Sequence, residues 1–488
     1  MPRIPLLIMP KKSFMEFIQS IDKPKKIAML VLSLASIILM ILFPYWGLSM
    51  DGIHGIMEWV PPFRYIIYFF IAIGITLPFL YAADLIKSWK TENPKRVPSR
   101  FFWTFALIWI ILPVGIFSFV TINQNTYAGD KPPQLLLEAN DSQQIPNYVI
   151  SFFTVEPTIN EVQWGTTLSM EKTIVETTAS REHAIRLTDL EPATQYFYQI
   201  NGEGQIYNFT TPPNQSNRLT FAATSDFHAG TSNTDHSITQ MIFDQIIDPA
   251  QNIDLFLACG DFVELGFRDA EWQEWIELVS PYSSHVPILP AIGNHDTIAN
   301  GKHFFASYYS PTGMETNGGT EFYRHVRIND VNFIVLNLQW SVESFDDDQA
   351  AWLNATLESI PQNEWIVVLS HAYHYSSGVY LAGMQWGDDA AMIETFHDLF
   401  VEHGVDLVFS GHNHHLEVCE VDGVTYLTVG GAGSHRDGER NLVSEGSVWY
   451  SQGTYGFARI DIDGSTAFYQ FIDENGVELY SGNTTISA

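Results

Sequence analysis

Five apolar runs in the chain each end in residues that can bind a metal ion. In chain order, the residues that follow these runs are Ser225-Asp226-Phe227-His228, Gly260-Asp261, Gly293-Asn294-His295-Asp296, His371, and Gly411-His412-Asn413-His414. The runs have the length of buried strands, and amphipathic helical patterns separate them. Because sites in open α/β sheets assemble at the carboxyl ends of strands, we expect these side chains to meet at one edge of a sheet. A glycine directly before a ligand lets the backbone turn sharply and approach the site closely.

The types of side chain limit which metal ions could bind. Carboxylate, imidazole and amide donors without cysteine suit divalent ions such as Mn, Fe or Zn. The donors are too many for one tetrahedral ion, but they suit two ions that share a bridging carboxylate, and such pairs clamp the oxygens of a phosphoryl transfer. His412 and His414 lie two apart on an extended segment, so their side chains point to the same face and can reach two adjacent ions. His415 points the other way, and we interpret it as a structural or rim residue.

The ordered set D-x-H, GD, GNHD, H and GHxH resembles the calcineurin-like metallophosphoesterase superfamily, and the resemblance covers about residues 133–475. It implies a four-layer α/β/β/α sandwich over residues 218–475 with two divalent ions, Fe, Mn or Zn. It also implies the ligands: Asp226, His228 and His414 would hold the first ion, Asn294, His371 and His412 the second, and Asp261 would bridge the pair. A hydroxide between the ions would attack the phosphorus in line.

The resemblance assigns roles to residues beside the ions as well. His295 would protonate the leaving oxygen or stabilise its charge, and Asp296 would orient His295. The β-rich segment before the catalytic region resembles that of purple acid phosphatases. Those enzymes place a tyrosinate where this chain has Glu264, and they lack the histidine that is His228 here. A ferric–tyrosinate centre is therefore not expected.

Three further residues are candidates for substrate contact. His374 would stand in for a substrate histidine that plant members carry some ten residues further on. His435 and Arg436 lie in the stretch GGAGSHRDGER, a glycine-rich loop like one that borders the site in relatives.

Residues 133–213 contain short alternating runs separated by turn residues, which predicts an all-β sandwich of six or seven strands. The stretch LTDLEPATQYFYQI resembles the E–F corner of a fibronectin type III-like domain, with Tyr196 as the tyrosine whose hydroxyl bonds to the upstream backbone. We expect this module to be a spacer or a wall of the neighbouring site. Residues 476–488 are expected to form a C-terminal tail. Cys259 and Cys419 lie in apolar stretches, which favours two buried thiols over a bridge.

Three stretches near the start are apolar and uncharged, namely 27–46, 65–83 and 101–122. Each has about the 20 residues that a membrane-spanning helix needs, so we predict three transmembrane helices. Lys and Arg cluster in residues 1–26 and in the loop between the second and third stretch. By the positive-inside rule these parts are cytoplasmic, and the chain after about residue 123 then lies outside the cell membrane.

The charge of the chain is very unevenly distributed. Residues 1–122 hold 12 Lys and Arg against 6 Asp and Glu, whereas residues 123–488 hold 12 against 49. Nucleic-acid binding needs a basic surface, so this acidic part excludes nucleic acid as a partner.

These observations predict a membrane-anchored, extracytoplasmic phosphoesterase with two metal ions. Its substrate would be a phosphate monoester of a small molecule or a surface polymer. One alternative is a phosphodiesterase or nucleotide hydrolase on the same scaffold, since loops decide that choice. An alternative of another class is a non-catalytic receptor or adhesion protein that keeps a retired phosphoesterase domain.

Overall fold

The structure is a computed structural model that describes residues 16, 122–123, 126–139, 145–214, 218–231, 234–248, 250–381, 384–451 and 453–486. The chain divides into two compact units, Met1–Ile122 and Asn123–Ala488. The three predicted transmembrane stretches lie outside the described residues, except for Ile122 at the end of the third. Within the described ranges, no helix is both long and apolar enough to cross a membrane.

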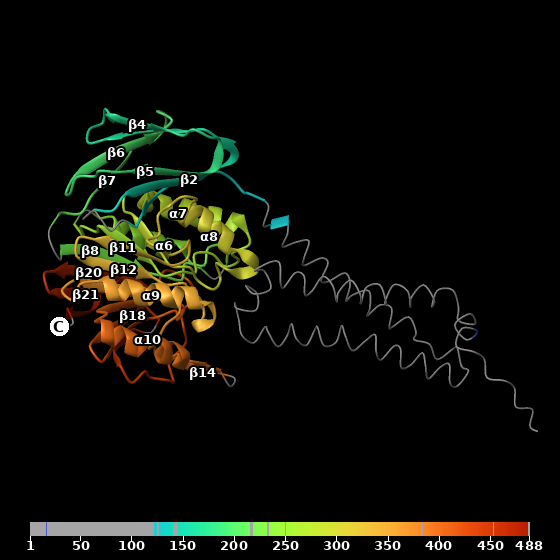
Figure 1. Cartoon of the computed structure of the whole chain (residues 1–488). Coiled ribbons are helices and arrows are strands. Elements are labelled where there is room, and N and C mark those ends of the chain that lie inside the picture. The colour runs from blue at the N-terminus through green and yellow to red at the C-terminus, as the bar shows by residue number, and fades with distance from the viewer. Residues whose placement is uncertain are drawn as a thin grey trace, which may run out of the picture. The chain divides into compact units, whose positions relative to one another are not determined.

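The second unit is built on two large sheets (Figure 1). The first has nine strands in the order β22-β21-β20-β8-β9-β10-β1-β2-β5. Their bounds are β1 (Lys131–Leu137), β2 (Tyr148–Thr158), β5 (Ser180–Leu187), β8 (Arg218–Thr224), β9 (Leu255–Ala258), β10 (Ile288–Pro290), β20 (Gly456–Asp463), β21 (Thr466–Asp473) and β22 (Glu478–Thr485). Strands β8, β9, β10 and β1 run parallel, as the alternation of apolar runs and helical patterns predicts.

The second sheet has seven strands in the order β11-β12-β13-β16-β18-β17-β19. Their bounds are β11 (Arg324–Ile328), β12 (Val331–Val335), β13 (Trp365–Leu369), β16 (Leu407–Ser410), β17 (Leu416–Val421), β18 (Val424–Val429) and β19 (Ser447–Ser451). A short hairpin of β14 (Val379–Leu381) and β15 (Met384–Trp386) and two 3-10 turns, η2 (Ile298–Asn300) and η3 (Val342–Ser344), lie in the connections.

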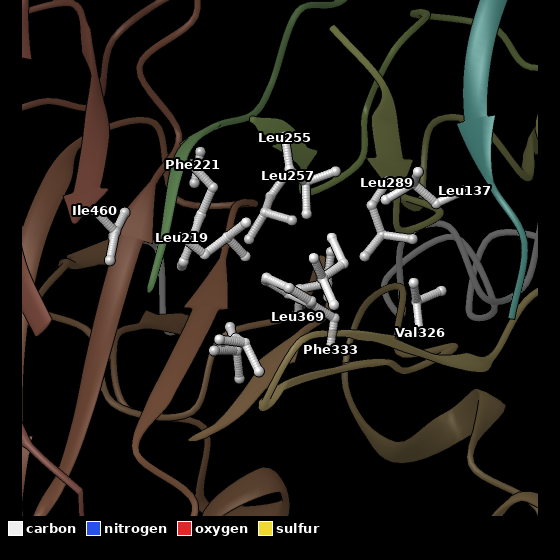
Figure 2. Packing of buried hydrophobic residues seen from close by; sticks show 14 of the residues in the cluster. Leu137, Leu219, Phe221, Leu255, Leu257, Leu289, Val326, Phe333, Leu369 and Ile460 are labelled. Carbon is white, nitrogen blue, oxygen red and sulfur yellow. The ribbon is translucent and has the colours of Figure 1, made fainter. Parts of the chain in front are cut away.

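The two sheets pack face to face through alternate residues of their strands. Phe221 of β8, Leu257 of β9, Phe333 of β12 and Leu369 of β13 are fully or almost fully buried in one cluster between the sheets (Figure 2). Residues that alternate with these point to the outer faces, because successive side chains of a strand lie on opposite sides. Burial of this apolar surface stabilises the unit.

Helices cover both outer faces. Helices α6 (His236–Ile246), α7 (Asp269–Ser283) and α8 (Lys302–Tyr309) pack on the nine-stranded sheet through a second cluster that includes Trp272 and Trp275. Helices α9 (Asp347–Ser359) and α10 (Ala390–His403) pack on the seven-stranded sheet through a third cluster that includes Phe396 and Phe400. The predicted four-layer α/β/β/α sandwich is thus confirmed.

The β-rich segment that precedes β8 also contains a four-stranded sheet in the order β4-β3-β6-β7. Its bounds are β3 (Glu161–Gly165), β4 (Lys172–Val175), β6 (Gln195–Ile200) and β7 (Tyr207–Thr210). The Glu191 amide donates to the Tyr196 hydroxyl at 2.8 Å, which is the upstream backbone contact that we predicted. The fibronectin type III-like assignment itself stays a prediction.

Two domain boundaries differ from the expectation. Strand β1 pairs in parallel with β10, with Leu136 opposite Ile288, so the β-rich segment and the catalytic region share one sheet. Residues 476–488, expected as a tail, contain β22, which pairs with β21 and forms the edge of that sheet. Cys259 and Cys419 are buried free thiols, as expected.

Candidate metal centre and active site

The five predicted ligand segments follow strands of both large sheets. Strands β8, β9 and β10 belong to the nine-stranded sheet, and β13 and β16 belong to the seven-stranded sheet. Our expectation of a single sheet edge was therefore wrong. The ligand residues still meet, because the carboxyl ends of the parallel strands in both packed sheets lie at the same end of the sandwich.

A first cluster joins Asp226, His228 and His414, each offering one ligand atom within 4.8 Å of the others. His414 Nε2 lies 3.2 Å from Asp226 Oδ1. His228 Nε2 lies 3.8 Å from the same oxygen. These are the three residues that the family resemblance assigns to the first ion.

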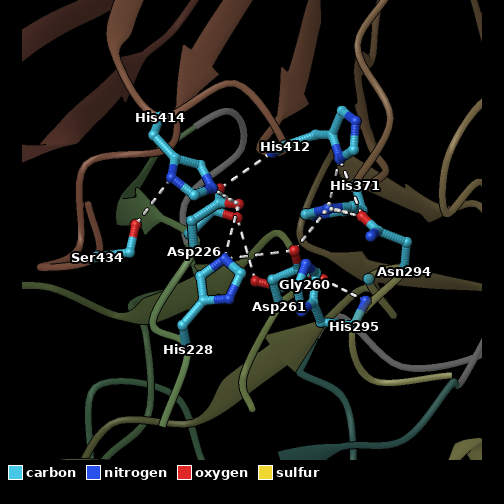
Figure 3. A network of polar contacts seen from close by, with 12 residues as sticks. Asp226, His228, Gly260, Asp261, Asn294, His295, His371, His412, His414 and Ser434 are labelled. Carbon is cyan, nitrogen blue, oxygen red and sulfur yellow. Dashed lines mark hydrogen bonds and ion pairs between the residues drawn. The ribbon is translucent and has the colours of Figure 1, made fainter. Parts of the chain in front are cut away.

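A second cluster joins Asp261, His371 and His412. Asn294 completes it, since its Oδ1 lies 2.9 Å from both His371 Nε2 and His412 Nδ1. Asp261 Oδ2 lies 3.2 Å from His371 Nε2 in this cluster and 3.5 Å from His228 Nε2 in the first. Asp261 therefore stands between the two clusters, where a bridging carboxylate belongs (Figure 3).

The donor set fits two divalent cations. Asp226 Oδ1 and His228 Nε2 are buried and lack a hydrogen-bond partner, a costly state unless a ligand compensates it. Three imidazoles also use their second nitrogen as metal-binding histidines do. His228 Nδ1 lies 2.9 Å from Glu264 Oε2, His371 Nδ1 lies 2.8 Å from the Cys259 carbonyl, and His414 Nδ1 lies 2.7 Å from the His435 carbonyl. Each of these contacts fixes which nitrogen faces the cluster.

The backbone at the site is strained. Asp226, His228, Asp261 and His412 all have positive φ, between 46° and 69°, which non-glycine residues rarely adopt. Such strain concentrates at functional sites, where the surrounding structure enforces it. At Gly293, a Cβ atom would lie 2.2 Å from Asp261 Oδ1, so only glycine allows the Asn294 segment this close to Asp261.

Electrostatics keep the carboxylates ionised. Burial alone would raise the pKa of Asp226, but His414 and His228 outweigh it and hold that pKa well below 3.8. Burial is likewise outweighed at Asp261, where His371 and His295 lower the pKa. Burial, with His371 beside it, lowers the pKa of His412 to about 3 and favours a neutral imidazole. Ionised carboxylates and a neutral imidazole are the forms that bind metals.

His295 lies beside the clusters, with its ring centroid 4.5 Å from that of His228. Its Nδ1 lies 2.9 Å from the Glu264 carbonyl oxygen, and this contact orients the ring. Burial lowers the pKa of His295.

Asp296 departs from its predicted role. Its carboxylate accepts hydrogen bonds from the backbone amides of Asp261, Phe262, Val263 and Gly293 at 2.8–3.2 Å. It therefore holds the loop that carries Asp261, and the orientation of His295 that we assigned to it falls to Glu264. No local sequence signal pointed to this, because the partners of Asp296 are backbone groups brought together only in the fold.

The three candidates for substrate contact lie in different surroundings. His435 is exposed, and its ring centroid lies 4.2 Å from that of His414, so it borders the first cluster. Arg436 bonds to the Gly453 carbonyl and stacks on Tyr455, which directs its guanidinium to that side of the loop.

His374 does not fit a substrate contact. This residue is only 1% exposed, and its ring packs against Phe396 and Phe400 of α10 and Tyr426 of β18, between that helix and the seven-stranded sheet. His415 is buried and bonds to Asp437 and Glu417, which confirms the structural interpretation.

Residues 219–416 match the family model described as calcineurin-like phosphoesterase. This part of the chain is similar to calcineurin-like phosphoesterase domains. All seven predicted ligands lie within the matched residues, and so do His295 and Asp296.

Curated relatives of the phosphoesterase domain include two plant enzymes. Purple acid phosphatase 21 of Arabidopsis thaliana is 27% identical over 268 residues, which are 52% of this chain and 58% of the relative. Purple acid phosphatase 18 of the same plant is 26% identical over 303 residues, which are 58% of this chain and 66% of the relative. The chain thus spans about three fifths of the length of these relatives.

A solved structure shares the fold. The purple acid phosphatase PPD1 from yellow lupin seeds superposes with a TM-score of 0.61 at 16% identity, covering 73% of this chain and 74% of that one. This likeness extends beyond the matched family model and so includes part of the sequence outside residues 219–416.

Proposed function

We propose that the chain is a two-metal phosphoesterase that hydrolyses phosphate monoesters. The observation that carries the proposal is the position of Asp261, whose Oδ2 lies within 3.5 Å of imidazole nitrogens from both clusters. When two divalent ions are bound, they supply Lewis acidity and a water of lowered pKa. The similarity to purple acid phosphatases supports the choice of a phosphate ester as substrate.

Different residues of the chain would bind the ions, donate a proton and hold the Asp261 loop. Asp226, His228 and His414 would hold one ion, Asn294, His371 and His412 the other, and Asp261 would contact both. His295, oriented through Nδ1 by the Glu264 carbonyl, would present its other ring nitrogen to the leaving oxygen and, in the imidazolium form, which carries a hydrogen on both nitrogens, donate a proton there. Asp296 would keep the Asp261 loop in its strained conformation through three amide hydrogen bonds, and it also accepts from the amide of Gly293 in its own segment.

We also propose that the phosphoesterase domain is anchored to a membrane and faces outward. The uncharged stretches 27–46, 65–83 and 101–122 and the cations around them support this. The substrate would then be a phosphorylated small molecule or a surface polymer on that side.

The test is metal-dependent turnover by the full chain. The protein is stripped of metal, reloaded with Mn, Fe or Zn, and assayed with p-nitrophenyl phosphate and bis(p-nitrophenyl) phosphate. We expect turnover of the monoester, reduced more than about 100-fold in Asp261→Asn because a shared ligand is lost. Asp254→Asn is the matched control, since Asp254 precedes β9 and Asp261 follows it.

Each outcome decides between the alternatives. Preference for the diester in the reloaded protein would replace the monoesterase with a phosphodiesterase. A folded, metal-loaded chain that turns over neither ester with any of the three metals would contradict the proposal and favour the retired, non-catalytic receptor.

A further inference from the structure

Two tryptophans from separate segments stand beside His412, which is shown in Figure 3. Trp340 lies in the connection after β12, and its ring centroid is 4.7 Å from that of His412 in an edge-on arrangement. Trp386 is the last residue of β15, and its ring is 6.4 Å from that of His412. The two indoles are 5.7 Å apart with an interplanar angle of 70°, so they form an aromatic corner, the Trp340–Trp386 corner.

The corner differs from the aromatic core of the domain. Trp272, Trp275 and Trp365 are fully buried, whereas Trp340 and Trp386 both keep part of their surface exposed. Packing against an imidazole ligand would explain Trp340 alone. It does not explain why a second indole reaches the same place from a separate hairpin. Exposed indole surface beside a metal cluster is what a site that binds a planar group would present.

The two sides of the metal centre offer different chemistry. The first cluster is bordered by the exposed imidazole of His435. The second is bordered by the Trp340–Trp386 corner and by Tyr373, whose ring lies 5.8 Å from that of His412. The metal ligands account for recognition of a phosphate. The Trp340–Trp386 corner is therefore available to recognise the group that is esterified to the phosphate.

We propose that the Trp340–Trp386 corner is a subsite for a planar aromatic group of the substrate, either an aryl group or a nucleobase. The proposal rests on the proposed function, because it assumes a phosphate ester at the metal centre. Both kinds of group have a flat π face that stacks on indole. Stacking of this kind contributes to the free energy of binding without needing hydrogen bonds.

The test compares aromatic and aliphatic ligands of equal charge on the metal-loaded full chain. Phenylphosphonate and methylphosphonate serve as competitive inhibitors of p-nitrophenyl phosphate hydrolysis. We expect phenylphosphonate to inhibit about tenfold more strongly in the wild type. This ratio should fall toward one in Trp386→Ala and recover in Trp386→Phe, which restores a flat ring. Trp352→Ala, a half-buried tryptophan of α9, is the matched control and should keep the ratio.

Turnover separates the two aromatic classes. The values of kcat/KM are compared for p-nitrophenyl phosphate, a nucleoside monophosphate and glycerol phosphate. A fall of about tenfold in the aryl-to-glycerol ratio or in the nucleoside-to-glycerol ratio in Trp386→Ala supports the subsite and shows which group it takes. Equal losses for all three esters and an unchanged inhibitor ratio would mean that the indoles only pack on His412, and would overturn the proposal. Failure of the proposed function is distinguishable, because the wild type would then hydrolyse none of the three esters.

Discussion

The Glu264 carboxylate lies 2.9 Å from His228 Nδ1, on the side of the ring that faces away from Asp226 and Asp261. The same residue orients His295 through its carbonyl oxygen. Glu264 thus orients two residues of the site, the predicted ligand His228 and the expected proton donor His295. It is itself assigned neither role. It occupies the place where purple acid phosphatases, by the resemblance, put a metal-binding tyrosinate.

We expect Glu264→Gln to weaken metal binding at the first cluster by about 10-fold, because the amide lacks the charge that makes His228 a stronger ligand. Titration of the metal-free protein with Zn or Mn measures this, and the affinity of the second cluster should not change. Glu274→Gln is the control, since Glu274 contacts His236 at 2.8 Å in a similar pair at the surface. Equal affinities in both variants would contradict the role given to Glu264.

Single residues were predictable where the signal was local. The seven predicted ligands stand at the ends of apolar runs, with a glycine before several of them, so strand ends and residue type pointed to these segments and the family resemblance assigned the ligands within them. Asp296 and His374 were not predictable in this way. Three of the four partners of Asp296 are amides of a distant loop, and His374 is buried by helix α10 and β18. Only the packing of the sandwich decides either contact.

At the scale of elements, the parallel strands β8, β9, β10, β13 and β16 bring their ends to the site, and their beginnings lie on the opposite side. Asp254 precedes β9 and accepts a hydrogen bond from the Thr220 amide of β8 at 3.0 Å. Burial, with Asp461 nearby, raises the pKa of Asp254 to about 6 from 3.8. The folded chain therefore holds a proton on this carboxyl at a pH where the unfolded chain has released it.

The consequence is a pH-dependent loss of stability. As pH rises from about 4 to about 6, this group lowers the free energy of unfolding, and the loss persists at higher pH. Asp254→Asn keeps an oxygen for the Thr220 amide but carries no charge. We expect the variant to be about 1–3 kcal/mol more stable than the wild type at pH 7.5 and nearly equal at pH 4, as denaturant unfolding of both proteins at the two pH values would measure. A constant difference at both pH values would contradict this account.

Elements were predictable when their apolar pattern was strong. The runs that became β9, β13 and β16 are almost entirely apolar, and the structure buries every residue of these strands. Strand β22 was missed because its sequence, ELYSGNTT, consists mostly of polar residues and contains no apolar run. Strands at the edge of a sheet can have such a sequence. The pairing of β1 with β10 joins residues about 150 positions apart. The sequence of a strand does not indicate which other strand it pairs with.

At the scale of the whole molecule, the buried ion pair of Lys131 and Asp269, 2.6 Å apart, ties the start of the β-rich segment to helix α7 of the region that matches the family model. Together with the shared nine-stranded sheet, it joins the β-rich segment to the catalytic region within the unit Asn123–Ala488. The change from a β-rich segment to alternating strands and helices was readable from the sequence pattern. The continuity of the sheet across them was not, because it depends on long-range pairing.

We propose that five strand ends from two sheets assemble one centre for two metal ions. The most direct test is the metal content of the purified full chain, measured by elemental analysis after saturation with Zn or Mn and removal of free metal. We expect about two ions per wild-type chain and fewer in Asp261→Asn, because the ligand between the clusters is weakened. Anomalous scattering from crystals should place one ion among Asp226, His228 and His414 and the other among Asn294, His371 and His412. A saturated wild-type chain that holds one ion or none would contradict the two-metal centre.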